Sequence, residues 1–268
     1  MRVVSLGDLA LDVVVRTRAE IARAADTPAR VSLSAGGQGA NVAAWVAALG
    51  GEAAWLGKRA VDPAGRIASD ELERRGVELL GPVEDGRNGI VVSLVDPTGE
   101  RSMFPDRGVA TQLQPEELRP EWLVGDHLHV SGYVLTTEPT ASAAVRAVEL
   151  ARAGGARISV DLSSWSAIQD VGPTRFRTLV ATVSPDVVFA NEEEDRVFGG
   201  ALPGVAWIVK RGPRGCSFDG VERDALPVAK VVDTTGAGDA LAAGFVLGGP
   251  ELALEAAARC VQRAGPMP

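Results

Sequence analysis

Residues 231–247 read VVDTTGAGDALAAGFVL, a glycine-rich turn followed by an Ala- and Leu-rich run. A turn that opens a helix leaves backbone N–H groups unpaired at the positive end of the helix dipole. That geometry binds phosphate and can stabilise the charge on a phosphoryl group in transfer. Asp239 would lie in the first helical turn, where its carboxylate can accept a proton from an attacking hydroxyl. A plain helix start, with Asp239 favoured by the dipole alone, fits the same residues, so the segment leaves two interpretations open.

On either side of this segment, short apolar runs alternate with segments of helical period, which is the pattern of βαβ units. Parallel strands that are buried on both faces show such continuous apolar runs. The sequence therefore predicts an α/β fold, a three-layer αβα sandwich around a mainly parallel sheet. The expected strands are Val3–Leu6, Ala53–Leu56, His127–Val130, Arg157–Val160, Val187–Phe189 and Trp207–Val209. The expected helices are Ala40–Leu49, Ala64–Arg75, Thr140–Ala153, Thr174–Ala181, Gly238–Leu247 and Glu251–Arg263.

Two pairs of short segments break the alternation and look like hairpin strands. They are Val13–Val15 with Val31–Leu33, and Ile90–Val95 with Arg101–Phe104, the second pair joined by the turn sequence DPTGE. They predict a small β-sheet lid over a cleft, contributed by about residues 12–35 and 88–106. No Pro/Ser-rich linker and no internal repeat occurs, so residues 1–268 are expected to form a single domain.

Polar and glycine residues follow the expected strands at the points where those strands end. In open α/β sheets the ligand crevice lies outside the carboxyl ends of the strands, so these residues predict a site at one edge of the sheet. They are Gly7-Asp8, Ser131-Gly132-Tyr133, Asp161, Asn191 with its acidic run, and Lys210-Arg211-Gly212.

The overall charge argues against a nucleic-acid partner, because the formal net charge is −8 where such proteins usually carry a basic face. No stretch matches the roughly 20 apolar residues that span a bilayer, and the N-terminus lacks the features of a secretory signal. Cys216 and Cys260 form no CxxC pair and are expected to be reduced thiols. These features predict a cytoplasmic protein without a membrane partner.

Two motifs make the chain resemble the ribokinase-like family, also called the PfkB carbohydrate kinases, over nearly its whole length. One is GGQGANVAAWVAALG from Gly36 to Gly50, and the other is DTTGAGDALAAGF from Asp233 to Phe245. The resemblance implies a ribokinase-like fold and ATP-dependent phosphorylation of a hydroxymethyl group, with Asp239 as the base. It implies that the amides of Gly236, Ala237 and Gly238 form an anion hole. It also implies that Asp233 and Thr235 match positions that bind a monovalent cation such as K⁺ in some members.

The resemblance places the sugar site at Asp12, Gly36, Gly37 and Asn41. The residue types agree, since glycines let the backbone approach a ligand and Asn41 can both donate to and accept from hydroxyls. Glycines that merely permit close packing of a helix on a strand would give the same pattern. Arg101 and Arg107, near the end of the expected lid, could contact an acidic or phosphorylated substrate, although surface arginines are common.

A second group of residues matches the nucleotide side of the family site. Asn191 and Glu194 fit an NxxE motif that helps hold Mg²⁺, Glu194 through water, and the phosphates of ATP. The neighbouring acidic residues read as the solvated first turn of a helix. Gly212 and Gly215 belong to a Gly-rich turn that would wall the nucleotide, and Lys210 could reach a phosphate or lie in solvent. His127 and His129 alternate along a strand without zinc-site spacing and are expected to be structural.

Other classes of enzyme lack their signatures here, since no Walker-A motif, protein-kinase motif set or GxSxG elbow occurs. The sequence predicts a kinase of a small sugar, of the ribokinase, fructokinase or 2-keto-3-deoxygluconate kinase type. A nucleoside kinase and a non-catalytic sugar- or nucleoside-binding protein on the same fold are the alternatives. The edge strands of the lid could also pair between subunits in a homodimer.

Overall fold

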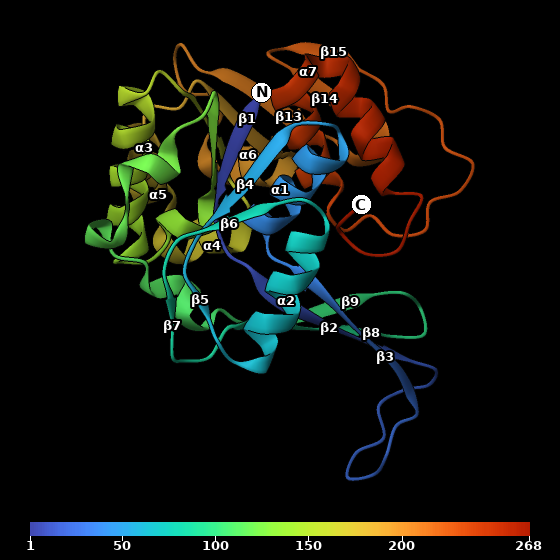
Figure 1. Cartoon of the computed structure of the whole chain (residues 1–268). Coiled ribbons are helices and arrows are strands. Elements are labelled where there is room, and N and C mark those ends of the chain that lie inside the picture. Colours follow the sequence, from blue (N-terminus) through green and yellow to red (C-terminus); the bar gives the residue numbers. More distant parts are fainter.

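The computed structural model describes all of residues 1–268 and has a nine-stranded central sheet at its centre (Figure 1). The strand order is β15-β14-β13-β12-β11-β10-β1-β4-β6, with every pair from β13 to β6 parallel and the last two strands, β14 and β15, antiparallel. The bounds are β1 Arg2–Leu6, β4 Glu52–Leu56, β6 Glu78–Leu80, β10 His127–Ser131, β11 Arg157–Asp161, β12 Val187–Asn191, β13 Ala206–Lys210, β14 Cys216–Phe218 and β15 Val221–Arg223. The six strands expected from the sequence are confirmed. The short strands β6, β14 and β15 were not predicted, because three residues carry too little periodicity to identify.

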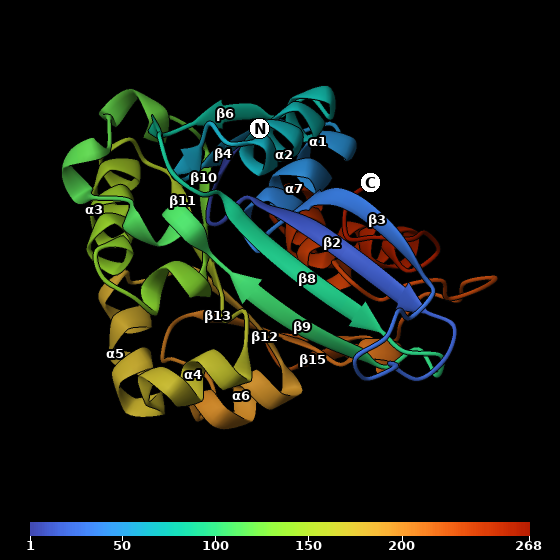
Figure 2. The ribbon, with the colours of Figure 1, turned by 90° about the horizontal axis from the view of Figure 1, so that it is seen from below.

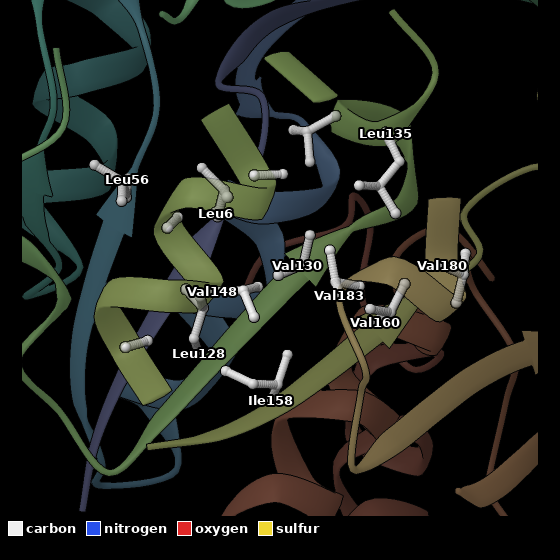
Figure 3. Packing of buried hydrophobic residues seen from close by; sticks show 14 of the residues in the cluster. Leu6, Leu56, Leu128, Val130, Leu135, Val148, Ile158, Val160, Val180 and Val183 are labelled. Carbon is white, nitrogen blue, oxygen red and sulfur yellow. The ribbon is translucent and has the colours of Figure 1, made fainter. Parts of the chain in front are cut away.

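Helices cover both faces of this sheet, which confirms the predicted three-layer sandwich. Figure 1 shows α3 and α5 on one side and α1 and α7 on the other. The bounds are α1 Gln38–Ala48, α2 Pro63–Arg74, α3 Thr140–Ala153, α4 Trp165–Val171, α5 Pro173–Thr182, α6 Glu192–Phe198 and α7 Ala237–Cys260. Each face has its own apolar core: α3 and α5 pack on one face through Ala147, Val148 and Val180 (Figure 3), and Ala43 of α1 and Ala243 of α7 belong to the other.

The long helix α7 is two helices joined at a sharp break. Gly249 has φ +77° and ψ −161°, and Pro250 follows it, so the chain turns back there. A Cβ at Gly244 would lie 2.5 Å from the carbonyl oxygen of Leu252, which shows that the two halves pack closely. By length and composition α7 could cross a membrane, contrary to the expectation that no segment could. Its break and its packing against α1 and the sheet instead make it a core helix.

Four of the six strands outside the central sheet form the separate small sheet that the sequence predicts. Its order is β3-β2-β8-β9, with β2 Ala10–Thr17, β3 Ala29–Gly36, β8 Gly89–Val95 and β9 Arg101–Asp106, and it lies across one end of the main body (Figure 2). A two-stranded pair of β5 Arg59–Ala60 and β7 Val83–Glu84 lies beside it.

The register of the small sheet gives its two faces different chemistry. Leu33, Val13, Val92 and Phe104 pair in one row across the sheet, so they share a face. Asp12 lies in the next row, and Arg16 pairs with Val95, which pairs with Arg101. Asp12, Arg16 and Arg101 therefore share the opposite face, and Arg101 contacts the main body from there.

The two histidines lie in the core between β10 and β11. His127 Nε2 and His129 Nδ1 both bond to the hydroxyl of Ser159, at 2.8 and 2.9 Å. Burial lowers the pKa of His127 to about 3 and that of His129 to about 4, so both rings are neutral at pH 7. Their role in this arrangement is structural.

Candidate active site

The carboxyl ends of five neighbouring strands carry the polar residues that the sequence placed there. In sheet order, Lys210 ends β13, Asn191 ends β12, Asp161 ends β11, Ser131 ends β10, and Gly7-Asp8 follow β1. The start of α7 meets this edge, because a Cβ at Gly238 would lie 3.2 Å from Nζ of Lys210. The expected site at one edge of the sheet is therefore assembled in the structure.

Asp239 stands in the first turn of α7 and contacts α1. Its Oδ2 accepts a hydrogen bond of 2.8 Å from Nδ2 of Asn41, which fixes the direction of the carboxylate. Burial, together with the nearby Asp161, raises the pKa of Asp239 to about 7, while Asn41 and Lys210 oppose that rise. A carboxylate with a pKa near neutrality is suited to take a proton from an alcohol.

The turn before Asp239 presents free backbone donors. Gly236 has φ +78°, and a Cβ there would lie 2.5 Å from the carbonyl oxygen of Pro266, so only glycine fits. The Ala237 amide donates to the carbonyl of Thr234 at 3.3 Å, whereas the Gly236 and Gly238 amides make no hydrogen bond within the protein. Of the three residues expected to form an anion hole, Gly236 and Gly238 thus have the free N–H groups.

Lys210 places a buried ammonium beside this helix start. Its Nζ donates to Oδ2 of Asp161 at 2.6 Å, and the side chains are 15% and 1% exposed. Burial would lower the pKa of Lys210, but Asp161 and Glu194 outweigh it and raise the pKa, so the group stays charged. The sequence left Lys210 undecided between a phosphate contact and a solvated charge, and its burial removes the solvated alternative.

Asn191 and Glu194 form a reciprocal cap at the start of α6. Oδ1 of Asn191 accepts from the backbone amides of Glu193 and Glu194. In return, the Glu194 carboxylate accepts from the backbone amide and from the side-chain Nδ2 of Asn191, both at 2.7 Å. Burial raises the pKa of Glu194, against the influence of Lys210. The acidic neighbours have other partners, since Glu192 pairs with Arg214 and Asp195 accepts from Trp207.

These residues fit a Mg²⁺ ion that is held mainly by phosphate and water. No group of three or more His, Cys, Asp or Glu side chains is arranged to hold a metal ion in the described chain. Each oxygen of Glu194 accepts one hydrogen bond and keeps a second lone pair for a metal-bound water. Mg²⁺ retains much of its hydration shell, so a water-mediated carboxylate suits it.

The expected sugar-site residues meet where the small sheet joins α1. A Cβ at Gly36 would lie 2.3 Å from Oδ2 of Asp12, so only a glycine at position 36 leaves room for the Asp12 carboxylate. Burial and the nearby Asp8 raise the pKa of Asp12 to about 7. Gly37 has φ +97° and caps α1, and Oδ1 of Asn41 is buried without a partner. Gly39 serves packing, since a Cβ there would lie 2.6 Å from Cα of Gly7.

Asp233 and Thr235, matched to cation-binding positions, are in contact with an arginine. Arg101 of β9 reaches Oδ1 of Asp233 at 3.1 Å and also donates to the hydroxyl of Thr235. Arg16 of β2 lies 3.8 Å from the other carboxylate oxygen. The small sheet is thus tied to the loop that leads into the α7 turn.

The glycines of the turn after β13 differ in what they do. Gly212 has φ +56° with open space around it, which leaves its surface free for a ligand. Gly215 has φ +86°, and a Cβ there would lie 2.0 Å from the carbonyl oxygen of Arg223. The backbone of β15 therefore accounts for Gly215, and its expected contact with a nucleotide stays a prediction.

Two clusters at the site join residues that the sequence named to partners that it did not reveal. Gln38 accepts from the hydroxyls of both Ser131 and Ser163, and Arg107 lies 2.9 Å from Asp8 and over the ring of Tyr133. Ser131, Tyr133 and Asp8 were expected at the site from their strand-end positions, whereas Gln38 was not. Ser163, with φ +73°, has no such signal.

Comparisons with known proteins identify the family of this chain. Residues 1–267 match the model of the pfkB family carbohydrate kinases. An ATP-dependent ribose-1-phosphate kinase of Halopiger xanaduensis is 31% identical over 97% of this chain and 90% of its own length. A fructokinase of Salmonella typhimurium is 32% identical over 79% of this chain and 75% of its own. The crystal structure of adenosine kinase from Sinorhizobium meliloti superposes with a TM-score of 0.86 at 25% identity, covering 99% of this chain and 95% of that one. The ribokinase-like fold predicted from the sequence is confirmed, and the chain belongs to the pfkB family of carbohydrate kinases.

Proposed function

We propose that this kinase transfers the γ-phosphoryl group of ATP to a hydroxymethyl group of a small sugar or sugar-like acceptor. The observation that carries the proposal is Asp239 beside the free amides of Gly236 and Gly238, with its carboxylate oriented by Asn41. Asp239 takes the proton from the acceptor hydroxyl as the oxygen of that hydroxyl attacks the γ-phosphorus of ATP. The two amides and the α7 dipole stabilise the charge on the phosphoryl group.

Lys210 and the cap residues act on the phosphate side of the reaction. The Lys210 ammonium has three donors, of which Asp161 uses one, so the others can reach a phosphate oxygen near Gly238. A Mg²⁺ ion held by water on Glu194 would neutralise phosphate charge when bound. Asn191 keeps Glu194 in place through the reciprocal cap.

The small sheet acts as a lid that holds the acceptor and excludes water. Asp12 on its inner face and Asn41 at the start of α1 offer acceptors to the sugar hydroxyls. Next to Arg107 and Tyr133 lies a cavity of about 480 Å³, which is also lined by Thr136, Ser164 and Arg175. An acceptor longer than a simple pentose, or one carrying an anionic group, can extend into it.

A coupled ADP-release assay over a panel of acceptors tests the function. The panel contains pentoses, fructose and other hexoses, ribose 1-phosphate, keto-deoxy sugar acids and nucleosides, each with Mg·ATP. Turnover with at least one acceptor is expected, and in Asp239→Asn it should be about 1,000-fold slower. Binding of an acceptor, seen as thermal stabilisation, without turnover of any would contradict the proposal and favour a binding protein.

The activity should decline in acid with an apparent pKa near 7. Only ionised Asp239 can accept the proton, and burial raises its pKa to about 7, so kcat/KM should fall about tenfold per pH unit below that value. Asp12 titrates in the same range, so Asp12→Asn is the control. If Asp239 is the titrating base, the fall in kcat/KM below pH 7 should remain in that variant. A profile of kcat/KM that is flat from pH 6 to 8 would exclude Asp239 as the titrating base.

The outer face of the lid is proposed as a homodimer contact with a second copy of this chain. Leu33 and Phe104, in the apolar row across the lid, are 53% and 59% exposed, and the edge strands β3 and β9 leave backbone groups unpaired. Leu33→Glu should convert a dimer to a monomer in light scattering after gel filtration. The control is Val221→Glu, on β15 with Val221 60% exposed, which should leave the mass unchanged. A monomeric parent protein at micromolar concentration would refute the contact.

We also place this protein in the cytoplasm, as a single domain of 268 residues. Both cysteines, Cys216 and Cys260, are buried free thiols, which suits a reducing compartment. Cell fractionation with an antibody tests the location.

A further inference from the structure

Resting on the proposed function, we infer that Arg101 is a positioning residue whose guanidinium serves as a built-in monovalent cation beneath the anion-hole turn. The side chain reaches from lid strand β9 to Asp233 and Thr235, two residues of the loop that ends in Gly236. It supplies the positive charge that a bound K⁺ would otherwise supply there. The enzyme should accordingly need no monovalent cation.

The carboxylate of Asp233 is the centre of this arrangement. Its side chain is only 7% exposed, and Oδ1 accepts from the Thr235 amide at 3.0 Å and from the Thr235 hydroxyl at 2.6 Å. Oδ2 accepts from the Gly265 amide at 3.3 Å, next to the Pro266 carbonyl on which Gly236 packs. Asp233 thus ties together the two segments that set the position of the Gly236 turn.

A buried carboxylate of this kind needs a positive partner, and the lid provides it. Arg101 bonds to both Asp233 and Thr235, and Arg16 approaches the same carboxylate at 3.8 Å. One carboxylate therefore faces two guanidinium groups. A metal cation added between them would meet like charge. Oδ1 of Asp233 already accepts three hydrogen bonds, and the Thr235 hydroxyl already donates one and accepts one. Asp233 and Thr235 as arranged here do not fit a monovalent metal ion.

Because this charge belongs to a side chain of the lid, its position depends on the position of the lid, whereas the position of a free ion does not. Arg16 lies on the same lid face as Asp12, four residues further along β2, and Arg101 lies in the row of Arg16. The guanidinium reaches Asp233 and Thr235 from the lid. A movement of the lid away from the main body would withdraw it, which couples the Gly236 turn to lid closure through a planar, always charged fork that holds two oxygen partners at once.

The test compares activity in K⁺, Na⁺ and choline buffers for the parent enzyme and for Arg101→Ala. The parent should have the same kcat in all three. Arg101→Ala should lose about 100-fold in kcat, the scale of one lost charge-stabilising interaction, with a smaller change in KM for ATP. K⁺ or methylguanidinium should restore part of this loss by filling the vacated place, and Arg101→Lys should retain more activity than Arg101→Ala. The control is Arg30→Ala, which removes an exposed arginine from the same row of the lid and should behave as the parent does.

A second readout separates this inference from the kinase assignment. Amide hydrogen exchange of residues 232–238 should be faster in Arg101→Ala than in the parent and should slow again with K⁺, whether or not an acceptor is known. A parent enzyme that requires K⁺ would overturn the inference. So would an Arg101→Ala variant with parental kcat and exchange, or one whose losses no cation restores. Absence of turnover in the parent, with the exchange pattern as expected, would instead count against the proposed function alone.

Discussion

Asp239→Asn should lower kcat by about 1,000-fold, within the range that a positioned general base contributes. The amide is nearly isosteric and can still accept from Nδ2 of Asn41, so the geometry is kept while the proton acceptor is lost. KM for ATP should change little, because Asp239 is not expected to contact the nucleotide. Steady-state kinetics with the acceptor found in the screen measure both constants.

The stability of the same variant distinguishes a catalytic role from a structural one. The pKa of Asp239 in the folded protein, about 7, lies above the ordinary value of 3.8, so its ionisation costs stability as the pH rises from about 4 to 7. The Asn variant escapes that cost, and its Tm at pH 8 should equal or exceed that of the parent. A much lower Tm would mean that Asp239 holds the fold together.

Asp12→Asn is the matched comparison, because Asp12 is the other carboxylate of the site with a pKa near 7. As a residue that binds the acceptor hydroxyls, it should raise the acceptor KM and change kcat by less than tenfold. If Asp12→Asn abolishes turnover while Asp239→Asn retains it, the base has been assigned to the wrong carboxylate.

Lys210→Met should lower both activity and stability. The ammonium beside Gly238 is lost, which should reduce kcat by roughly 100-fold or more, as for other groups that stabilise transferred charge. Asp161, 1% exposed, is left as a buried carboxylate without its ion-pair partner, and this should cost about 3 kcal/mol of unfolding free energy. Denaturant unfolding and steady-state kinetics measure the two effects.

The double variant Asp161→Asn/Lys210→Met separates the two effects of Lys210. It removes both members of the buried pair, so most of the lost stability should return. Activity should not return, because the charge near the phosphate is still missing. Recovery of activity along with stability would show that Lys210 acts only through the fold.

The fold could be predicted largely because its signals are local. Continuous apolar runs marked the six longer parallel strands, and Gly249-Pro250 ends one helix before the next begins. The strand-end rule then brought Lys210, Asn191 and Asp161 to one edge without knowledge of their partners. The short strands and α4 escaped prediction, since segments of two to seven residues show too few repeats of any period.

The family, the sheet and the turn of Gly236 to Asp239 can be predicted from the amino-acid sequence, because each is encoded in consecutive residues or in residues of one period. The partners of those residues become known only when the chain is folded. Asn41 and Asp239 are 198 residues apart, Arg101 and Asp233 are 132 apart, and Lys210 and Asp161 are 49 apart. Such pairs depend on the order of strands in the sheet and on where the lid lies, and hydrophobic periodicity carries no information about either. Burial, which raises the pKa of Asp239 to about 7, follows from the same assembly and could not be derived from GAGD alone.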